Sequence, residues 1–143
     1  PFIALLADES VLKVLHACGE DLEVFQHYFQ QLPQPMCDTQ VMANFLGFAG
    51  STGFATLVQH YFHIEIDKGA SRTDWLARPL SEIQLRYAAA DVWYLLPLYA
   101  QMQTQLAQTE WQSAVKNEYI SYRTLLLYIK TAAYYQSGCL RYL

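Results

Sequence analysis

The spacing of apolar residues changes several times along the chain and predicts a series of short elements. Residues 3–6 are apolar and lead to Asp8, a pattern typical of a helix end and a turn. The run 11–17 is short, apolar and partly β-branched, and it stops at Gly19, so its length favours a buried strand. Within 21–31 the apolar residues recur at helical spacing. A helix therefore follows the strand.

The middle of the chain predicts two more short helices and a long loop. Asp38 precedes an apolar helical pattern, where its carboxylate can accept hydrogen bonds from free backbone amides, and Gly47 should end that helix. Residues 54–61 repeat the helical spacing. Residues 67–79 are rich in Gly, Ser, Thr and charge and have little periodicity, which indicates a loop.

The longest predicted helix begins at Ser81, and Pro97 should bend it, because proline has no amide hydrogen to donate. After Trp111 the pattern changes to short, aromatic-rich helical stretches. We therefore divide the chain into one domain over 1–110 and a helical connector over 111–143.

Composition narrows the class of protein. A chain of 143 residues that is 53% hydrophobic and 15% charged can bury the core of one globular domain. It has no apolar run of roughly 20 residues and no secretory signal pattern, so a cytoplasmic location is expected. Cys18, Cys37 and Cys139 are odd in number and widely spaced, which favours reduced core residues over disulfides or a zinc site.

The formal net charge of −4 gives no support to a broad basic surface for nucleic acid. An acidic balance is still compatible with a nucleic-acid enzyme, because carboxylates can hold divalent cations that make the phosphate contacts instead.

Tyr87 and Asp91 are separated by three alanines. Residues four apart share one face of a helix, so the phenol and the carboxylate should point into the same space. The alanines keep that part of the helix slender, which would allow a strand or a nucleotide to approach. Spacing alone leaves a second interpretation open, in which the pair lies on an ordinary solvated face.

The segment 16–21 combines a strand end, a glycine turn and an acidic helix start, a junction where functional residues often gather. The alternative is helix capping, in which Glu20 or Asp21 offsets the positive end of the helix dipole. His16 is likewise more often a packed residue than a ligand or base when it stands alone at a strand end.

Taken together, residues 15–25 and 87–96 resemble the second and third motifs of the DEDD exonuclease superfamily, tyrosine subclass, and in particular the ribonuclease D family. Three intervening segments match in the same order: 32–35, 37–40 and 71–80. The resemblance covers nearly all of residues 1 to about 107, and such an ordered series is more specific than any single motif.

The resemblance implies an α/β domain with the ribonuclease H-like exonuclease fold, here mainly its helical second half. It also implies two Mg²⁺ or Mn²⁺ ions that activate a water and stabilise the leaving 3′ oxygen. By the same resemblance Asp91 is a direct metal ligand, and Asp21 acts on the metals or the terminal nucleotide largely through water. The Tyr87 hydroxyl would orient the attacking water, and His16 would contact the 3′-terminal nucleotide.

The chain departs from the family at the first motif, an aspartate and a glutamate separated by one residue on the first strand. That motif should lie upstream of residue 1, and the adjacent pair Asp8-Glu9 does not replace it. We therefore expect that the chain alone does not cleave RNA. At the other end, residues 126–143 loosely resemble the entry into a helical nucleic-acid-binding, HRDC-like domain.

Some roles stay open between two interpretations. Arg72, Arg78 and Lys68 could touch the RNA backbone, or Arg78 could pair with Asp74 and hold the loop. Three aromatic residues of the long helix are expected in the core rather than as stacking platforms: Trp93, Tyr94 and Tyr99.

The expected substrate is RNA with a free 3′ end, threaded 3′ end first, and the resemblance suggests precursors of transfer RNA. Two rivals remain. A proofreading-type DNA exonuclease shares the tyrosine motif, and digestion of matched RNA and DNA strands would distinguish it. A non-catalytic binding module on the same scaffold would lack the upstream alternating acids.

Overall fold

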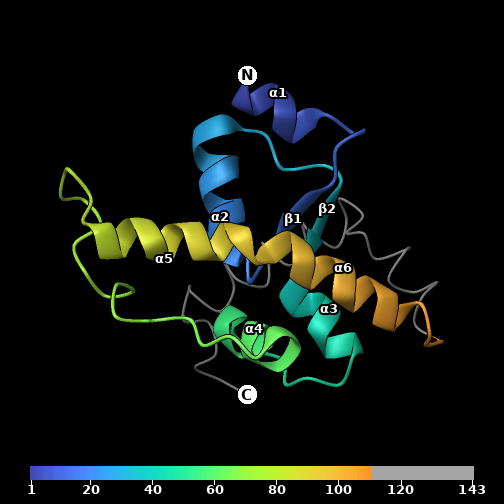
Figure 1. Cartoon of the computed structure of the whole chain (residues 1–143). Helices are drawn as coiled ribbons and strands as arrows, with labels where there is room; N and C mark the ends of the chain where they lie inside the picture. Colours follow the sequence, from blue (N-terminus) through green and yellow to red (C-terminus); the bar gives the residue numbers. More distant parts are fainter. Residues whose placement is uncertain (111–143) are drawn as a thin grey trace, which may run out of the picture.

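The computed structural model describes residues 1–110. Seven helices and two strands follow one another along this part of the chain (Figure 1). Their bounds are α1 Phe2–Ala7, β1 Lys13–Leu15, α2 Gly19–Val24, η1 Phe25–Phe29, β2 Met36–Asp38, α3 Thr39–Phe45, α4 Phe54–Phe62, α5 Glu82–Trp93 and α6 Leu95–Leu106. The connector and the HRDC-like segment expected in 111–143 lie outside the described residues. The loop expected between α4 and α5 is present.

The sheet within the described part consists of β1 and β2, which pair in parallel from Lys13↔Met36 to Leu15↔Asp38. We expected β1, although its regular part is shorter than 11–17. We did not predict β2, whose three residues are all buried and follow two prolines. Strands buried on both faces lack the alternation of polar and apolar residues that marks an exposed sheet.

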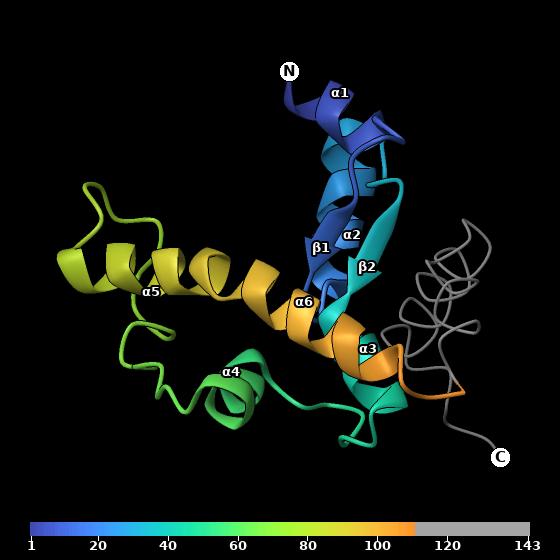
Figure 2. The same ribbon diagram turned by 45° about the vertical axis from the view of Figure 1, so that its right-hand side comes forward.

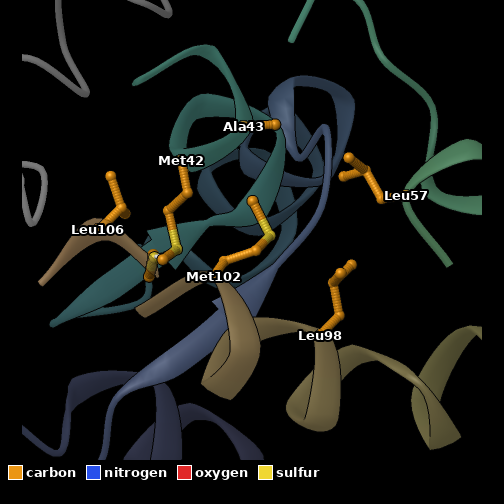
Figure 3. Close-up of a cluster of buried hydrophobic side chains, with 7 residues drawn as sticks. Met42, Ala43, Leu57, Leu98, Met102 and Leu106 are labelled. Carbon is orange, nitrogen blue, oxygen red and sulfur yellow. Dashed lines mark hydrogen bonds between the residues drawn. The ribbon is translucent and has the colours of Figure 1, made fainter. Parts of the chain in front are cut away.

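Successive residues of β2 point to opposite faces of the sheet, and each face has its own apolar cluster. Met36 packs with Cys18, Leu22 and Leu32 on the side of α2. Cys37 packs on the other side, in the cluster drawn in Figure 3. That cluster contains Met42 and Ala43 of α3, Leu57 of α4, and Leu98, Met102 and Leu106 of α6. Helix α6 therefore joins α3, α4 and the sheet into one core.

Cys18 and Cys37 are both buried and unbridged, as expected for reduced core cysteines. Burial raises the pKa of the Cys37 thiol to about 12, and the nearby Asp38 carboxylate adds to the effect. Burial also raises the pKa of the Cys18 thiol, so both thiols are protonated at neutral pH and chemically quiet. Cys139 lies beyond residue 110.

Two predicted helices are interrupted. The one expected over 21–31 forms a short α2 and continues as the π-helix η1, which ends at Gln30 in a left-handed conformation. The long helix from Ser81 breaks at Tyr94 into α5 and α6, earlier than the bend expected at Pro97. Proline lacks the amide hydrogen for the carbonyl four residues back, and its ring crowds that carbonyl, so the break precedes Pro97. Pro97 then occupies the first turn of α6, where no such bond is required.

None of the helices described in residues 1–110 is long and apolar enough to cross a membrane.

Candidate active site

Helix α5 presents the predicted phenol and carboxylate. It begins with a reciprocal capping box, in which Ser81 accepts from the backbone of Gln84 and the Gln84 side chain accepts from the backbone of Ser81. Tyr87 lies about one helical turn after Gln84, and Asp91 lies one turn after Tyr87. Both residues are half-buried. Burial raises the pKa of Asp91. It also raises the pKa of Tyr87, and the Asp91 charge adds to that shift, as expected for two groups on one helix face.

A pocket of about 440 Å³ lies between α5 and residues 64–67. Tyr87 and Ala90 are among the α5 residues that line it, and Tyr94, at the break between α5 and α6, lines it as well. The phenol of Tyr87 therefore borders a space large enough for small molecules or part of a nucleotide.

The turn before α2 is built around Asp38, which the sequence suggested only as a helix cap. Its carboxylate accepts hydrogen bonds from the backbone amides of Ala17 at 2.9 Å and Cys18 at 3.0 Å. It also accepts from the amide of Gln40 at 2.7 Å, which is the predicted capping bond of α3. Ala17 has a φ of 53°, a conformation that residues other than glycine rarely adopt. Asp38, only 5% exposed, therefore holds a strained turn in place.

Asp21 lies in the first helical turn of α2, shortly after the strained backbone at Ala17. The residue as a whole is exposed. Its pKa is raised by partial burial and by the negative charges of Glu20 and Asp38. Figures 1 and 2 both place the start of α2 beside the α5–α6 junction, where Asp91 is located in the last turn of α5. Two carboxylates with raised pKa values therefore come from helix ends that lie side by side.

His16 is half-buried and is held by its neighbours. Its Nδ1 lies 2.9 Å from the hydroxyl oxygen of Thr39, and its ring lies 5.5 Å from the ring of Phe54. Burial lowers its pKa, with the Asp38 carboxylate acting in the opposite direction. Its Nε2 is buried and makes no hydrogen bond within the described residues. The ring is therefore packed on both sides in this part of the chain, and the predicted nucleotide contact stays a prediction.

Replacing Thr39 with Val is expected to lower the free energy of unfolding by roughly 1–3 kcal/mol, the usual cost of leaving buried polar groups unpaired. Thr39 is fully buried, and its hydroxyl donates to the Leu15 carbonyl at 3.1 Å besides contacting His16. Thr39→Ser keeps the hydroxyl and should retain most of the stability. Urea titration followed by circular dichroism compares the two, and equal losses would show that the hydroxyl contacts contribute nothing.

The two predicted acids have the chemistry of metal ligands, because carboxylate oxygens suit Mg²⁺ and Mn²⁺. Neither Asp21 nor Asp91 forms a side-chain hydrogen bond or ion pair with another residue in 1–110. Their oxygens are therefore available. Within the same residues no group of three His, Cys, Asp or Glu side chains is arranged to hold a metal ion. Asp21 and Asp91 thus fit as part of a ligand set that needs further carboxylates.

Several side chains of the loop 67–79 donate hydrogen bonds to backbone carbonyls of the same loop. Arg78 donates from Nη1 to the carbonyls of Trp75 and Ala77, both at 2.9 Å. Asp74 instead accepts from the amide of Leu76, so the Arg78–Asp74 pair that we considered does not form among the described residues.

One aromatic prediction was wrong. Trp93 is 75% exposed, although we expected it in the core. Tyr94 and Tyr99 are half-buried, with Tyr94 beside Phe62 and Tyr99 packed against the α3–α4–α6 cluster.

Comparison with known proteins agrees with the motif-based interpretation. A family model described as 3′-5′ exonuclease matches residues 1–107. Ribonuclease D of Haemophilus influenzae is 60% identical over 118 residues, which are 82% of this chain and 30% of that protein. The crystal structure of Escherichia coli RNase D superposes with a TM-score of 0.82 at 47% identity, covering 90% of this chain and 34% of the other.

A structure of Brucella melitensis NrnC with bound Mg²⁺ is 27% identical, with a TM-score of 0.74, and covers 91% of this chain and 62% of that one. The chain spans about a third of the length of the ribonuclease D proteins it matches. These likenesses confirm the expected ribonuclease H-like exonuclease fold and the expected resemblance. The chain therefore belongs to the 3′-5′ exonuclease family, in which it resembles the ribonuclease D enzymes.

Proposed function

We propose that this chain is the part of a 3′-5′ exoribonuclease that carries Asp21, Tyr87 and Asp91, and that the enzyme hydrolyses RNA from its 3′ end with two divalent ions. One observation carries the proposal. Two unpaired carboxylates, each with a raised pKa, come from adjoining ends of α2 and α5, and a phenol lies one turn from one of them. Family membership of residues 1–107 supports the same reaction class.

Each residue has a distinct role in this proposal. When bound, Mg²⁺ or Mn²⁺ supplies the Lewis acidity that activates the attacking water and stabilises the leaving 3′ oxygen. Asp91 would hold such an ion directly, and Asp21 would act largely through water. The Tyr87 hydroxyl can donate or accept a hydrogen bond and would orient the water beside Asp91. Its raised pKa keeps it protonated at neutral pH, so that it can act as a donor. His16 would contact the terminal nucleotide.

The proposed substrate is RNA with a free 3′ end, in particular precursors of transfer RNA. Escherichia coli RNase D, at 47% identity, is an exoribonuclease involved in structured RNA processing. The ribonuclease D relatives named above come from bacteria, which have no nucleus and mature their RNA in the cytoplasm, so we propose that the enzyme works there.

The test requires the upstream acids. The segment of Haemophilus influenzae ribonuclease D that precedes its matched region can be joined to Pro1 of this chain, giving what we call the completed enzyme. We expect it to shorten 5′-labelled RNA stepwise from the 3′ end, to stop on chelation of divalent ions, and to recover when Mg²⁺ or Mn²⁺ is returned. The 143-residue chain alone should be inactive. Denaturing gel electrophoresis over time measures both.

Three results would contradict the proposal in different ways. Faster digestion of a DNA strand of the same sequence would favour the proofreading-type exonuclease. RNA binding without shortening would favour the non-catalytic module. Activity of the 143-residue chain that is abolished by Asp91→Ala would show that no upstream acids are needed.

A further inference from the structure

Gln84 is a buried polar side chain that the proposed chemistry does not use. It is 5% exposed, and both ends of its amide are occupied. The oxygen accepts from the amide of Ser81 at 2.8 Å and from the Ser81 hydroxyl at 3.0 Å. The nitrogen donates to the hydroxyl of Thr73 at 3.1 Å and to the carbonyl of Asp74 at 2.9 Å. The oxygen therefore serves the start of α5, whereas the nitrogen holds the long loop that precedes it.

The loop backbone held by Gln84 leads directly to Trp75. The indole nitrogen of Trp75 donates to the Ala70 carbonyl at 3.2 Å, and its ring packs on Tyr87 with centroids 5.9 Å apart and planes tilted by 56°. Tyr87 is only half-buried, and it has no side-chain hydrogen bond within the described residues. The Trp75 ring is thus the aromatic neighbour that restricts how the Tyr87 ring can turn.

We propose that Gln84 is a positioning residue for Tyr87: its amide nitrogen fixes residues 73–74 so that Trp75 stays packed against the phenol. Gln84 and Tyr87 are three residues apart and therefore neighbours on the surface of α5. Loss of the two donor bonds removes the hydrogen bonds from Gln84 to residues 73–74. The other bonds of this segment, from Thr73 and Trp75 to the Ala70 carbonyl and from Arg78 to the Trp75 carbonyl, all lie within the loop. The inference deepens the proposed function, because it matters for catalysis only if Tyr87 acts there.

Two single substitutions separate this role from helix capping. Gln84→Glu keeps an oxygen for the Ser81 bonds, but its carboxylate can donate to neither Thr73 nor Asp74. Ser81→Ala is the matched control, because it removes the hydroxyl from the capping box and leaves the Gln84 amide nitrogen with both loop partners. Only Ser81→Ala loses part of the capping arrangement, and only Gln84→Glu loses the loop bonds.

The readout is the nuclear Overhauser effect between the ring protons of Trp75 and Tyr87, measured in the isotope-labelled 143-residue chain without metal or RNA. We expect Gln84→Glu to reduce these cross-peaks at least about threefold while the chain remains folded, and Ser81→Ala to leave them within about a fifth of the parent intensity. Thermal unfolding by circular dichroism verifies that each variant is folded at the temperature of the measurement. A loss of stability alone would not remove cross-peaks from the folded chain.

Unchanged cross-peaks in folded Gln84→Glu, or equal losses in both variants, would overturn the inference. If Gln84→Glu does not fold, Thr73→Val removes one of the two loop bonds, together with the bond from the Thr73 hydroxyl to the Ala70 carbonyl. It should reduce the cross-peaks about twofold, and no reduction would again overturn the inference. An inactive completed enzyme would contradict the proposed function without changing this result, because the experiment requires neither cleavage nor metal binding.

Discussion

Replacing Asp91 with Asn is expected to lower the rate of RNA 3′-end hydrolysis by the completed enzyme roughly 10³-fold or more. A metal-bound water and a metal-stabilised leaving group lower the barrier by several kcal/mol, and each 1.4 kcal/mol is about tenfold in rate. Asn keeps the size of the side chain but loses the charge that attracts the ion. Single-turnover digestion of 5′-labelled RNA at saturating Mg²⁺ measures the effect.

Glu82→Gln is the matched control for this change. It makes the same carboxylate-to-amide replacement on the same helix, at a side chain that is 83% exposed and forms a surface pair with Arg86. Such surface pairs contribute little, so its rate should stay within about twofold of the parent. Similar losses in both variants would mean that general negative charge on α5, and not a ligand at Asp91, supports the reaction.

The same Asp91 substitution should not lower stability, because burial raises the pKa of this carboxyl above its ordinary value of 3.8. The unfolded chain then loses the Asp91 proton at lower pH than the folded chain does. Ionisation of Asp91 therefore opposes folding increasingly as pH rises from 3.8 through the raised pKa, and its full cost is present above that value.

Asn does not ionise, so in metal-free buffer near neutral pH the Tm of Asp91→Asn should equal or exceed that of the parent. The difference should vanish below the ordinary carboxyl pKa. Differential scanning calorimetry of the 143-residue chain across this pH range tests the sign. A lower Tm for Asp91→Asn near neutral pH would show that the carboxylate stabilises the fold, contrary to a residue kept free for a ligand.

Local pattern was sufficient to predict the helix that carries Tyr87 and Asp91. A spacing of four residues fixes a shared face in any α-helix, and the pKa of Tyr87 responds to Asp91 as that geometry requires. The Asp38 cap was predictable for the same reason, because a capping side chain bonds to an amide two residues away. The capping box at Ser81 follows an equally local pattern, in which a serine is followed three residues later by a glutamine. We predicted the helix start at Ser81 but not the role of Gln84.

Contacts between distant segments could not be read from the sequence. The amides of Ala17 and Cys18 bond to an acid about 20 residues later, and no local rule connects them. The exposure of Trp93 could not be predicted either. A helical pattern shows which residues share a helix face, but it does not show whether another segment covers that face. β2 was missed because three buried residues between prolines and a helix cap are too few to show a period.

Replacing Asp38 with Ala should lower the free energy of unfolding by roughly 3–5 kcal/mol, because it removes the acceptor of three backbone amides at once. Alanine leaves the amides of Ala17 and Cys18 without a protein partner in a partly buried turn. The left-handed Ala17 then has no compensation for its strain. Urea unfolding of the 143-residue chain, analysed as a two-state transition, measures the loss.

Asp38→Asn separates the bonds from one another. Ala17 and Gln40 both donate to Oδ1, which Asn retains, whereas Cys18 donates to Oδ2, which Asn replaces with an NH₂ group. This variant should therefore lose roughly 1–3 kcal/mol, less than Asp38→Ala. Asp67→Asn changes a comparable but exposed contact, to the amide of Gly69, and should change stability by at most about 0.5 kcal/mol. Equal losses for Asp38→Asn and Asp38→Ala would mean that the charge of Asp38, rather than its hydrogen bonds, holds the turn that leads to Asp21.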